Sequence, residues 1–358
     1  MDFLWLFIFY AFFLILCVSV YCFLSGRSTS GLDSALHRTE QVISLVLPAR
    51  LQRCIHSCFH ARSAAFVFLH LILDALVFAE FTWEVLDYSL ELDLSRSLVF
   101  LPYILITVNL YFFYKCCTSD PGRVTKQNES LYVQVYKYDE IMFHRDQTCP
   151  TCHLTKPARS KHCGVCGSCV QRFDHHCVWV NNCIGGLNIR YFLLYLLSLT
   201  LTAVSLAAVI TLFLLQVVLL SHMMTAAYVD SEGHQEMATV TYIIQQLFLT
   251  FPRIVFTLGF LVLLILFLGG YTCFLFYLSI TNRTTNEWYK ARRNHRTPKG
   301  YSRGILGNIR ELFQPHHLYN VRASQPLWLH DVTSSECQCG HVAAEDAIRP
   351  RRNVLVKD

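Results

Sequence analysis

The sequence from Cys149 to Cys183 reads C-P-T-C-H-L-T-K-P-A-R-S-K-H-C-G-V-C-G-S-C-V-Q-R-F-D-H-H-C-V-W-V-N-N-C, and it decides the architecture of this 358-residue chain. The segment holds seven of the sixteen cysteines and four histidines, mostly at Cys-x-x-Cys spacing. A structural zinc ion takes four Cys or His ligands in a tetrahedron. The density and spacing of these residues therefore predict bound zinc.

The ligand count predicts two zinc sites, with one cysteine and one histidine left over. The seven cysteines and three of the histidines, His162, His175 and His176, offer ten ligands, whereas two tetrahedral sites need eight. The remaining pair lies within the run D-H-H-C at 174–177. A thiol beside an imidazole is the arrangement of a nucleophile with its base, so the segment combines metal ligands with a candidate catalytic pair.

The rest of the chain has the composition of a membrane protein, with 53% hydrophobic residues, 15% charged residues and a mean hydropathy of +0.36. A segment of about 20 apolar residues crosses the ~30 Å hydrocarbon core of a bilayer. One candidate span, 64–83, is interrupted by Asp74 and Glu80, whose charges are costly in lipid. Four further candidate spans carry no charged residue: 3–24, 97–114, 191–220 and 254–280.

The distribution of Lys and Arg predicts how these spans are oriented. The loop 25–63 carries five such residues, the insert 115–190 carries ten and the tail 281–358 carries thirteen. The segment 84–96 carries one, and 221–252 carries none. Because basic segments stay cytoplasmic, we expect five spans, a lumenal N-terminus, and a cysteine-rich segment and C-terminus in the cytoplasm. That compartment is reducing, which favours metal-bound and free thiols over disulfides.

We therefore expect an all-α polytopic membrane protein of five transmembrane helices with a small, irregular, cytoplasmic two-zinc domain. The cysteine-rich segment is too polar to build its own apolar core, so metal must supply its folding energy. Residues 131–143 alternate in part and indicate a strand or irregular chain, whereas Ile305 to Phe313 is amphipathic. The expected division is three spans with a cytoplasmic loop in 1–118, the zinc domain in 119–190, two spans in 191–280 and a cytoplasmic tail in 281–358.

The segment from Cys149 to Phe192 closely resembles the DHHC family of protein S-acyltransferases. The matched pattern is C-x2-C-x3-K-P-x-R-x2-H-C-x2-C-x2-C-x4-D-H-H-C-x-W-V-x-N-C-I-G-x2-N-x3-F. Two further marks of the family are the D-P-G run at 120–122 and the T-T-x-E run at 284–287. Five spans exceed the family's usual four, and this arrangement resembles an endoplasmic-reticulum member. The resemblance therefore implies a multi-pass protein of the endoplasmic reticulum or, as second choice, the Golgi.

The resemblance also implies a role for each residue of the segment. Cys177 is implied to be the acyl-accepting nucleophile, His175 its general base, and Asp174 the group that orients the imidazole. Trp179 is implied to lie beside the acyl carbonyl, and Thr285 of the T-T-x-E run to contact the aspartate. The implied ligands of two interleaved structural zinc ions are Cys149, Cys152, His162 and Cys169 for the first, and Cys163, Cys166, His176 and Cys183 for the second.

The implied activity is transfer of a long-chain acyl group from acyl-CoA, such as palmitoyl-CoA, to target cysteines through a thioester on Cys177. The implied partners are membrane and cytosolic proteins with juxtamembrane cysteines, and the lipid bilayer. Nothing in the chain resembles a nucleic-acid-reading element, so we expect no nucleic acid partner. The phosphates of coenzyme A need cations. The candidates, each with a solvated surface charge as the alternative, are Lys156, Arg159, Lys161 and Arg172.

Three interpretations stay open on sequence alone. The alternative to an enzyme is a membrane-anchored zinc module that only binds partners, such as a RING-like ubiquitin ligase or a scaffold; an unliganded Cys177 discriminates between the two. His70 and Asp74 are spaced i,i+4 and form either a buried structural pair or part of a proton or substrate path. Six cysteines are undecided between acylated and plain thiols: Cys54, Cys58, Cys116, Cys117, Cys337 and Cys339.

Overall fold

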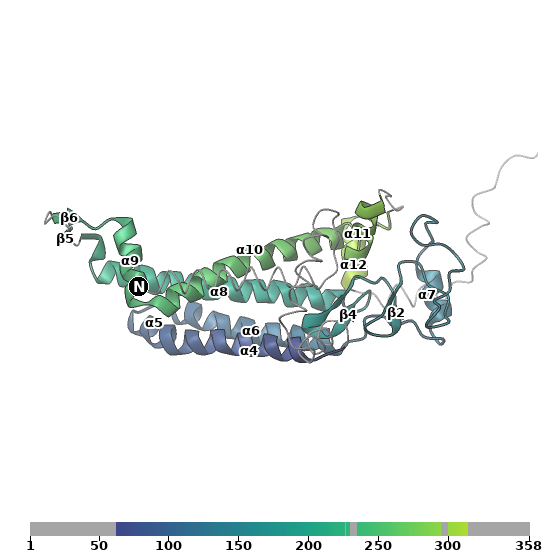
Figure 1. The fold of residues 1–358 in the computed structure, drawn as a ribbon, viewed down its shortest axis with the longest axis horizontal. Coiled ribbons are helices and arrows are strands. Elements are labelled where there is room, and N and C mark those ends of the chain that lie inside the picture. Colours follow the sequence, from purple (N-terminus) through teal and green to yellow (C-terminus); the bar gives the residue numbers. More distant parts are fainter. Residues whose placement is uncertain (1–61, 226, 230–234, 295–299, 314–358) are drawn as a thin grey trace, which may run out of the picture.

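The computed structural model describes residues 62–225, 227–229, 235–294 and 300–313. The described part is an elongated helical bundle with the cysteine-rich segment at one end (Figure 1). The expected first span, 3–24, lies outside the described residues. Four of the undecided cysteines also lie outside them: Cys54, Cys58, Cys337 and Cys339.

Four helical segments among the described residues are long and apolar enough to cross a membrane. The first consists of α4 (Ala65–Phe81), the π-helical turn η1 (Thr82–Leu86) and α5 (Asp87–Glu91). The other three are α6 (Arg96–Thr118), α8 (Ile189–Leu220) and α10 (Pro252–Ile280). The structure therefore supports four of the five expected membrane helices, and it leaves the fifth undescribed.

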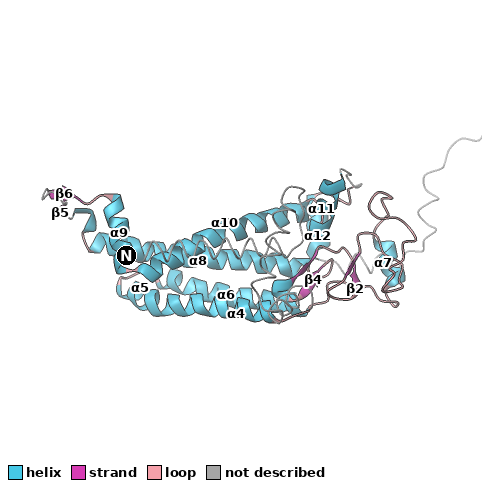
Figure 2. Cartoon of the chain, viewed as in Figure 1, coloured by secondary structure: helices cyan, strands magenta, loops and turns pink. Residues whose placement is uncertain are grey.

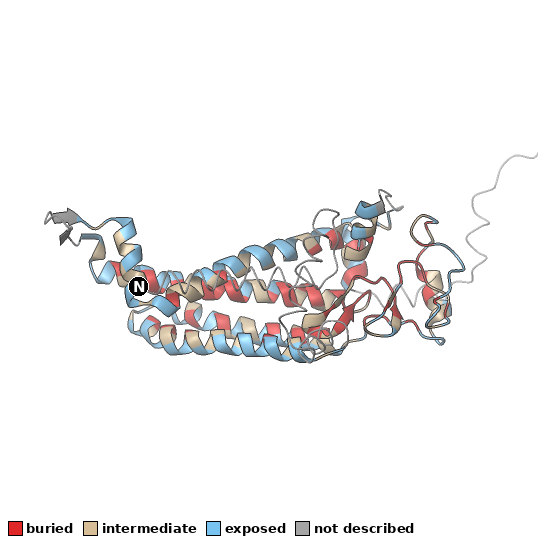
Figure 3. Ribbon diagram, in the orientation of Figure 1, coloured by how far each residue is buried: buried red, intermediate tan, exposed pale blue. Residues whose placement is uncertain are grey.

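Helix α8 is the central helix of the bundle and packs against both α6 and α10. Half of its most apolar window is buried (50%), against 11% for the windows of the first helical segment and of α10. Figure 3 shows the consequence: α8 carries many buried residues, while α4 and α10 turn much of their surface outward. Outward-facing apolar side chains suit hydrocarbon, because lipid tails are as apolar as leucine.

Several polar side chains inside the bundle contact a neighbouring helix. The amide of Asn109 in α6 donates to the Tyr195 carbonyl at 2.9 Å and to Ser198 Oγ at 3.0 Å. His70 Nε2 lies 3.3 Å from Asp74 Oδ2 and 3.1 Å from the Tyr195 hydroxyl. These contacts tie α4 and α6 to α8, and they favour the structural interpretation of the His70–Asp74 pair.

The two ends of the bundle carry short strands, so the chain is not all-α. At the end away from the cysteine-rich segment, β5 (Ala227–Val229) pairs with β6 (Gln235–Met237) between η3 (Met223–Thr225) and α9 (Val240–Thr250) (Figure 1). In the cysteine-rich segment, two more antiparallel hairpins replace the irregular chain that the sequence predicts (Figure 2). They are β1 (Lys161–Cys163) with β2 (Ser168–Val170), and β3 (His175–Cys177) with β4 (Asn182–Ile184) across the 3-10 turn η2 (Val178–Val180).

The predicted strand or irregular chain at 131–143 is wrong in its first part, which belongs to helix α7 (Glu129–Val135). Tyr132 and Val135 are the buried residues of this helix, and their i,i+3 spacing places them on one face. They pack in an apolar cluster that includes Cys149 and Leu154. Packing against the cysteine-rich segment therefore favours a helix here, although the partial alternation of the sequence indicates a strand.

Two helices follow the last membrane helix and return to the cysteine-rich end (Figure 1). Helix α11 (Thr285–Asn294) begins within the T-T-x-E run. Helix α12 (Ile305–Phe313) is the predicted amphipathic stretch, and it packs against α10 and α8. Its buried residues are Asn308, Glu311 and Leu312, so it brings a carboxylate into the protein interior.

A close backbone approach joins the membrane bundle to the cysteine-rich hairpins. The Asp120 carboxylate accepts the N–H groups of Gly122 and Arg123, both at 3.1 Å, and so fixes the turn that follows α6. Gly185, which follows β4, lies against this turn. A Cβ atom at Gly185 would stand 2.5 Å from the Pro121 carbonyl oxygen and 2.6 Å from a methyl group of Val170. Glycine is therefore required at this position.

We expect Gly185→Ala to destabilise the cysteine-rich domain by roughly 1–3 kcal/mol, because the Pro121 backbone cannot move aside as a flexible side chain would. Gly164→Ala is the matched control, since an added Cβ there meets no atom within 4 Å. The measurement is resistance of residues 119–190 to limited proteolysis as temperature rises. Equal resistance of the two variants would contradict the close packing at Gly185.

Candidate active site

The three-residue strand β3 sends two adjacent histidines in opposite directions. Successive side chains of a strand point to opposite faces, so His175 and Cys177 share one face and His176 takes the other. Across the hairpin, His176 pairs with Cys183 and Cys177 pairs with Asn182. The alternation of side chains along β3 thus places His175 and Cys177 on one face and the candidate metal ligand His176 on the other.

Among the described residues, two groups of Cys and His side chains are close enough to hold one metal ion each. Within each group the four ligand atoms all lie within 4.8 Å of one another. Three thiols and one imidazole are a donor set typical of structural zinc. Alternation along β1 again sends adjacent residues to different groups. The groups are Cys149, Cys152, His162 and Cys169, and Cys163, Cys166, His176 and Cys183. Cys177 belongs to neither.

The other face of β3 holds the candidate catalytic residues. His175 Nδ1 lies 2.7 Å from Asp174 Oδ2. Asp174 is 6% exposed, and the Cys177 side chain, in contact with His175, is buried as well. The imidazole ring packs against Phe192 of α8, with ring centroids 5.2 Å apart. The carboxylate, imidazole and thiol therefore lie in sequence at the cysteine-rich end of the bundle.

The three groups shift each other's protonation. Burial alone lowers the pKa of His175, but its hydrogen bonds to Asp174 and Cys177 outweigh burial and raise that pKa to about 10. Burial raises the pKa of the Cys177 thiol, yet the hydrogen bond and charge of His175 bring it below its ordinary value. Both shifts favour a thiolate beside an imidazolium, which is the reactive form of a cysteine nucleophile.

The T-T-x-E run is a capping box at the first turn of α11. Thr284 Oγ1 accepts the Glu287 N–H at 3.2 Å, and Glu287 Oε2 accepts the Thr284 N–H at 3.1 Å. The next residue, Thr285, donates its backbone N–H to Asp174 Oδ1 at 2.7 Å. The start of a helix favours negative charge, so the same turn that is capped by Glu287 also binds the carboxylate that orients His175.

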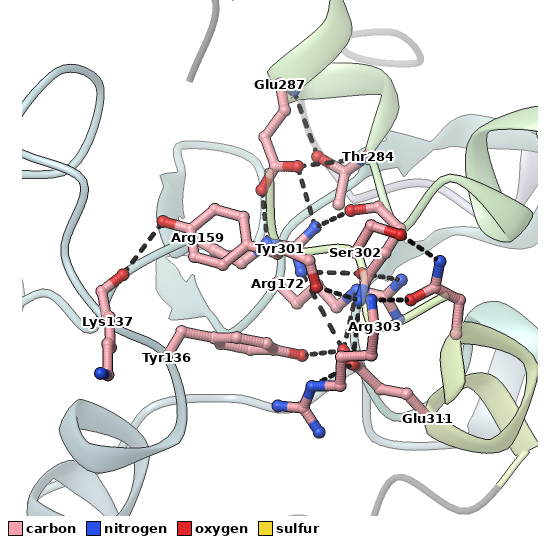
Figure 4. A network of polar contacts seen from close by, with 12 residues as sticks. Tyr136, Lys137, Arg159, Arg172, Thr284, Glu287, Tyr301, Ser302, Arg303 and Glu311 are labelled. Carbon is pink, nitrogen blue, oxygen red and sulfur yellow. Dashed lines mark hydrogen bonds and ion pairs between the residues drawn. The ribbon is translucent and has the colours of Figure 1, made fainter. Parts of the chain in front are cut away.

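Arg159 and Arg172, two of the predicted acyl-CoA contacts, are buried inside the protein. Arg159 is 0% exposed and Arg172 is 4% exposed. Both donate to Asn282, and Arg159 also forms an ion pair with Glu287 (Figure 4). The burial of both side chains and these contacts inside the protein argue against the expectation that the two arginines contact the acyl-CoA head group.

The other two predicted cations, Lys156 and Lys161, stay accessible, and the structure adds a third. Burial, followed by the nearby charges of Lys161 and Lys156, lowers the pKa of Lys290 in α11. Lys161 is exposed and Lys156 and Lys290 are half-buried. Sequence reasoning missed Lys290, because it lies 129 positions after Lys161 and no motif marks it. Lys290 therefore lies near both predicted cations, and the carboxylates of Glu287 and Asp139 act on it in the opposite direction.

Apolar side chains surround the candidate nucleophile on its membrane side. Cys177 belongs to a buried cluster that joins Phe113 of α6, Tyr195 of α8 and Leu275 of α10. Trp179 packs against this cluster, and its ring centroid lies 5.4 Å from that of Phe66. The cluster also includes buried Cys116, with half-buried Cys117 packed against it. The thiol of Cys177 thus lies between polar groups of the cysteine-rich segment and the apolar interior of the bundle.

Comparison with known proteins agrees with these features. Residues 142–292 match the family model described as DHHC palmitoyltransferase. Palmitoyltransferase ZDHHC4 of Bos taurus is 47% identical over 335 residues, which cover 88% of this chain and 97% of the relative. The Mus musculus protein of the same name is 47% identical over 337 residues, with the same coverage. Palmitoyltransferase SWF1 of Yarrowia lipolytica is 46% identical over 92 residues, or 26% of this chain and 24% of the relative.

We expect the purified chain to hold two equivalents of divalent metal, and Cys183→Ala to lose at least one, because a four-ligand structural site fails without one of its thiols. Cys273→Ala, which removes an exposed thiol of α10 outside both groups, is the control and should keep both. Metal content is measured by atomic emission on equal amounts of folded protein. Two equivalents in the Cys183→Ala chain would show that Cys183 is not a ligand.

Proposed function

This chain belongs to the DHHC palmitoyltransferase family and is a protein S-palmitoyltransferase, and on that premise we propose that Cys177 carries the acyl group as a thioester between donor and target. One arrangement carries the proposal: Cys177 belongs to neither ligand group, and it lies beside His175, whose Nδ1 is 2.7 Å from Asp174 Oδ2. A module that only binds partners has no use for such a thiol.

The proposed reaction has two balanced half-reactions. In the first, His175 accepts the proton of the Cys177 thiol, and the thiolate attacks the carbonyl carbon of acyl-CoA. The bond to the CoA sulfur breaks, and the departing CoA thiolate takes the proton from His175. In the second, a target cysteine gives its proton to His175 and attacks the Cys177 thioester, which restores the thiolate. Asp174 keeps the imidazole oriented throughout and stabilises its charge.

The metal is proposed to be zinc, with a structural role in both groups. Three thiolates and one imidazole at each site suit Zn²⁺. Bound zinc would supply folding energy to two hairpins whose strands are three residues long and which have little apolar core of their own. Each hairpin contributes ligands: β1 and β2 hold His162, Cys163 and Cys169, while β3 and β4 hold His176 and Cys183. Fixing these strands fixes the alternate face that carries His175 and Cys177.

The acyl-CoA donor is proposed to divide between two environments. The acyl chain would enter the apolar bundle beside Trp179, where each buried methylene contributes ~0.8 kcal/mol. The phosphates would bind Lys156, Lys161 and Lys290, of which Lys290 lies near the other two. Chemistry at Cys177 would then occur where these two environments meet.

The proposed setting is a multi-pass protein of the endoplasmic reticulum, with the Golgi as second choice, whose catalytic end faces the cytoplasm and whose N-terminus is lumenal. The excess of Lys and Arg in 115–190 and 281–358 supports this orientation. Targets would be membrane and cytosolic proteins whose cysteines lie near the bilayer, because the candidate nucleophile lies beside the end of the membrane helices.

His175→Ala should slow autoacylation by roughly 10²–10⁴-fold and keep both metal ions, because it removes the base and no ligand. His176→Ala, its neighbour, should lose metal, because it removes a ligand. Cys177→Ser should keep both metal ions and form no hydroxylamine-labile acyl group. Autoacylation rate and metal content are measured on the same samples. If His175→Ala loses metal while His176→Ala keeps it, the two roles are reversed.

Lys290→Ala should raise the palmitoyl-CoA concentration at half-maximal autoacylation rate by roughly 2- to 10-fold, because a partly solvated charge pair contributes modest free energy. Added salt should shrink the difference. Lys126→Ala removes an exposed lysine outside the trio and serves as control. A palmitoyl thioester of a small neutral thiol should react equally with both variants. An equal loss with that donor would show that Lys290 does not act on the phosphates.

A further inference from the structure

The guanidinium of Arg159 is held on every side. Its Nε and Nη2 atoms donate to the two carboxylate oxygens of Glu287, at 2.6 and 2.9 Å. Its Nη1 donates to Asn282 Oδ1 at 2.9 Å, and Nη2 donates to the Asn282 carbonyl at 3.0 Å. The rings of Tyr136 and Tyr301 stand against it with centroids at 4.8 and 4.5 Å (Figure 4). Such a guanidinium has a fixed position and cannot follow a ligand.

Glu287 connects the fixed guanidinium of Arg159 to the first turn of α11. Its Oε2 atom accepts from Arg159 and from the Thr284 N–H, so one oxygen belongs to the ion pair and to the capping box. The adjacent N–H, of Thr285, binds Asp174 Oδ1. A line of direct contacts therefore runs from the cysteine-rich segment at Arg159, through the turn after the last membrane helix, to the catalytic aspartate.

Both oxygens of Asp174 are used in this line. Oδ1 accepts the Thr285 N–H, and Oδ2 binds His175 Nδ1. The carboxylate can rotate about its own axis, so a donor on Oδ1 decides where Oδ2 points. The position of the Thr285 N–H therefore sets the plane of the carboxylate and, through it, the direction of the imidazole.

Stability alone is a poor explanation for this ion pair. Arg159 is fully buried and Glu287 is 3% exposed. The cost of removing two such charges from water is often as large as their attraction, and apolar residues of similar volume frequently serve as well. A capping box, moreover, needs only Glu or Gln at this position and no arginine. The arginine adds direction, because its planar fork fixes a carboxylate in two dimensions.

We propose that Arg159 and Glu287 are positioning residues of the acyl transfer: together they hold the first turn of α11 against Asp174 and thereby aim His175 at Cys177. The hydrogen bonds of their side chains go to each other, to Asn282 and to Thr284. The proposal rests on the function proposed above for Cys177, His175 and Asp174, and it adds the device that orients them.

The test compares two identical chemical changes within one buried network. Glu287→Gln keeps a residue that completes a capping box and removes the charge that Arg159 holds. Glu311→Gln makes the same change at a carboxylate that is also 3% exposed, accepts from Tyr136 and Asn282 and lies 4.0 Å from Arg159 Nη1, but its hydrogen bonds do not reach the first turn of α11. Autoacylation is measured at increasing palmitoyl-CoA, with metal content and thermal stability on the same samples.

We expect Glu287→Gln to lower the autoacylation rate at saturating palmitoyl-CoA by about 10- to 100-fold, the scale of a misplaced catalytic group. The half-saturating concentration and both metal ions should be unchanged. Glu311→Gln should keep the saturating rate within about 3-fold, even where it lowers thermal stability as much. If both variants lose saturating autoacylation rate in proportion to their loss of thermal stability, the proposal is wrong, because the network would then only stabilise the fold.

Arg159→Lys keeps the test decisive if Glu287→Gln fails to fold, since it retains the buried charge and removes the fork. It should lower the saturating rate in the same way, and combining it with Glu287→Gln should add little, because both act on one line of contacts. Cys177→Ser separates the two proposals. If it is inactive while the Arg159 and Glu287 variants keep the full rate, the positioning role is wrong and the function stands. If it still forms a labile acyl group, the function itself is wrong.

Discussion

The alternation of side chains along the three-residue strand β3 is the constraint on which the rest of the site depends. It sends His176 to one face, where three thiols complete a metal-ligand group, and sends His175 and Cys177 together to the other. A helix at this position would spread the three side chains over more than half of a turn. A strand of three residues has little stability of its own. The orientation of β3 therefore depends on the metal-ligand group of His176 and on pairing with β4.

Contacts from outside the cysteine-rich segment complete the site. Asp174 receives the Thr285 N–H from the turn after α10, and that turn is tied back to the segment by the Arg159–Glu287 ion pair. The segment is small and polar. Its metal-ligand groups stabilise it on one side, and the helices that follow the membrane bundle stabilise it on the other. This arrangement places the candidate nucleophile at the boundary between a polar domain and an apolar bundle.

The sequence predicts those parts of the structure that depend on local spacing. It indicates four described membrane helices and the amphipathic helix α12, and the ligand count indicates two metal sites. The division of the eight ligands comes from the resemblance to the DHHC family, and the structure brings the same eight together as two groups. It fails where a partner lies far along the chain. Arg159 is of a residue type that commonly binds phosphate, but its ion pair with Glu287, 128 positions away, holds it inside the protein. The trio that includes Lys290 and the helix α7 are likewise decided by packing between distant segments, which no local pattern records.

Isolation of the acyl-enzyme tests the central claim most directly. The purified chain is incubated with palmitoyl-CoA without a protein acceptor, and its intact mass and peptide map are recorded before and after neutral hydroxylamine. The account predicts one hydroxylamine-labile palmitoyl group on the peptide that contains Cys177, and its loss when a target protein is added. A labile group on a metal-ligand cysteine such as Cys183, or turnover with no acylated chain, would contradict it.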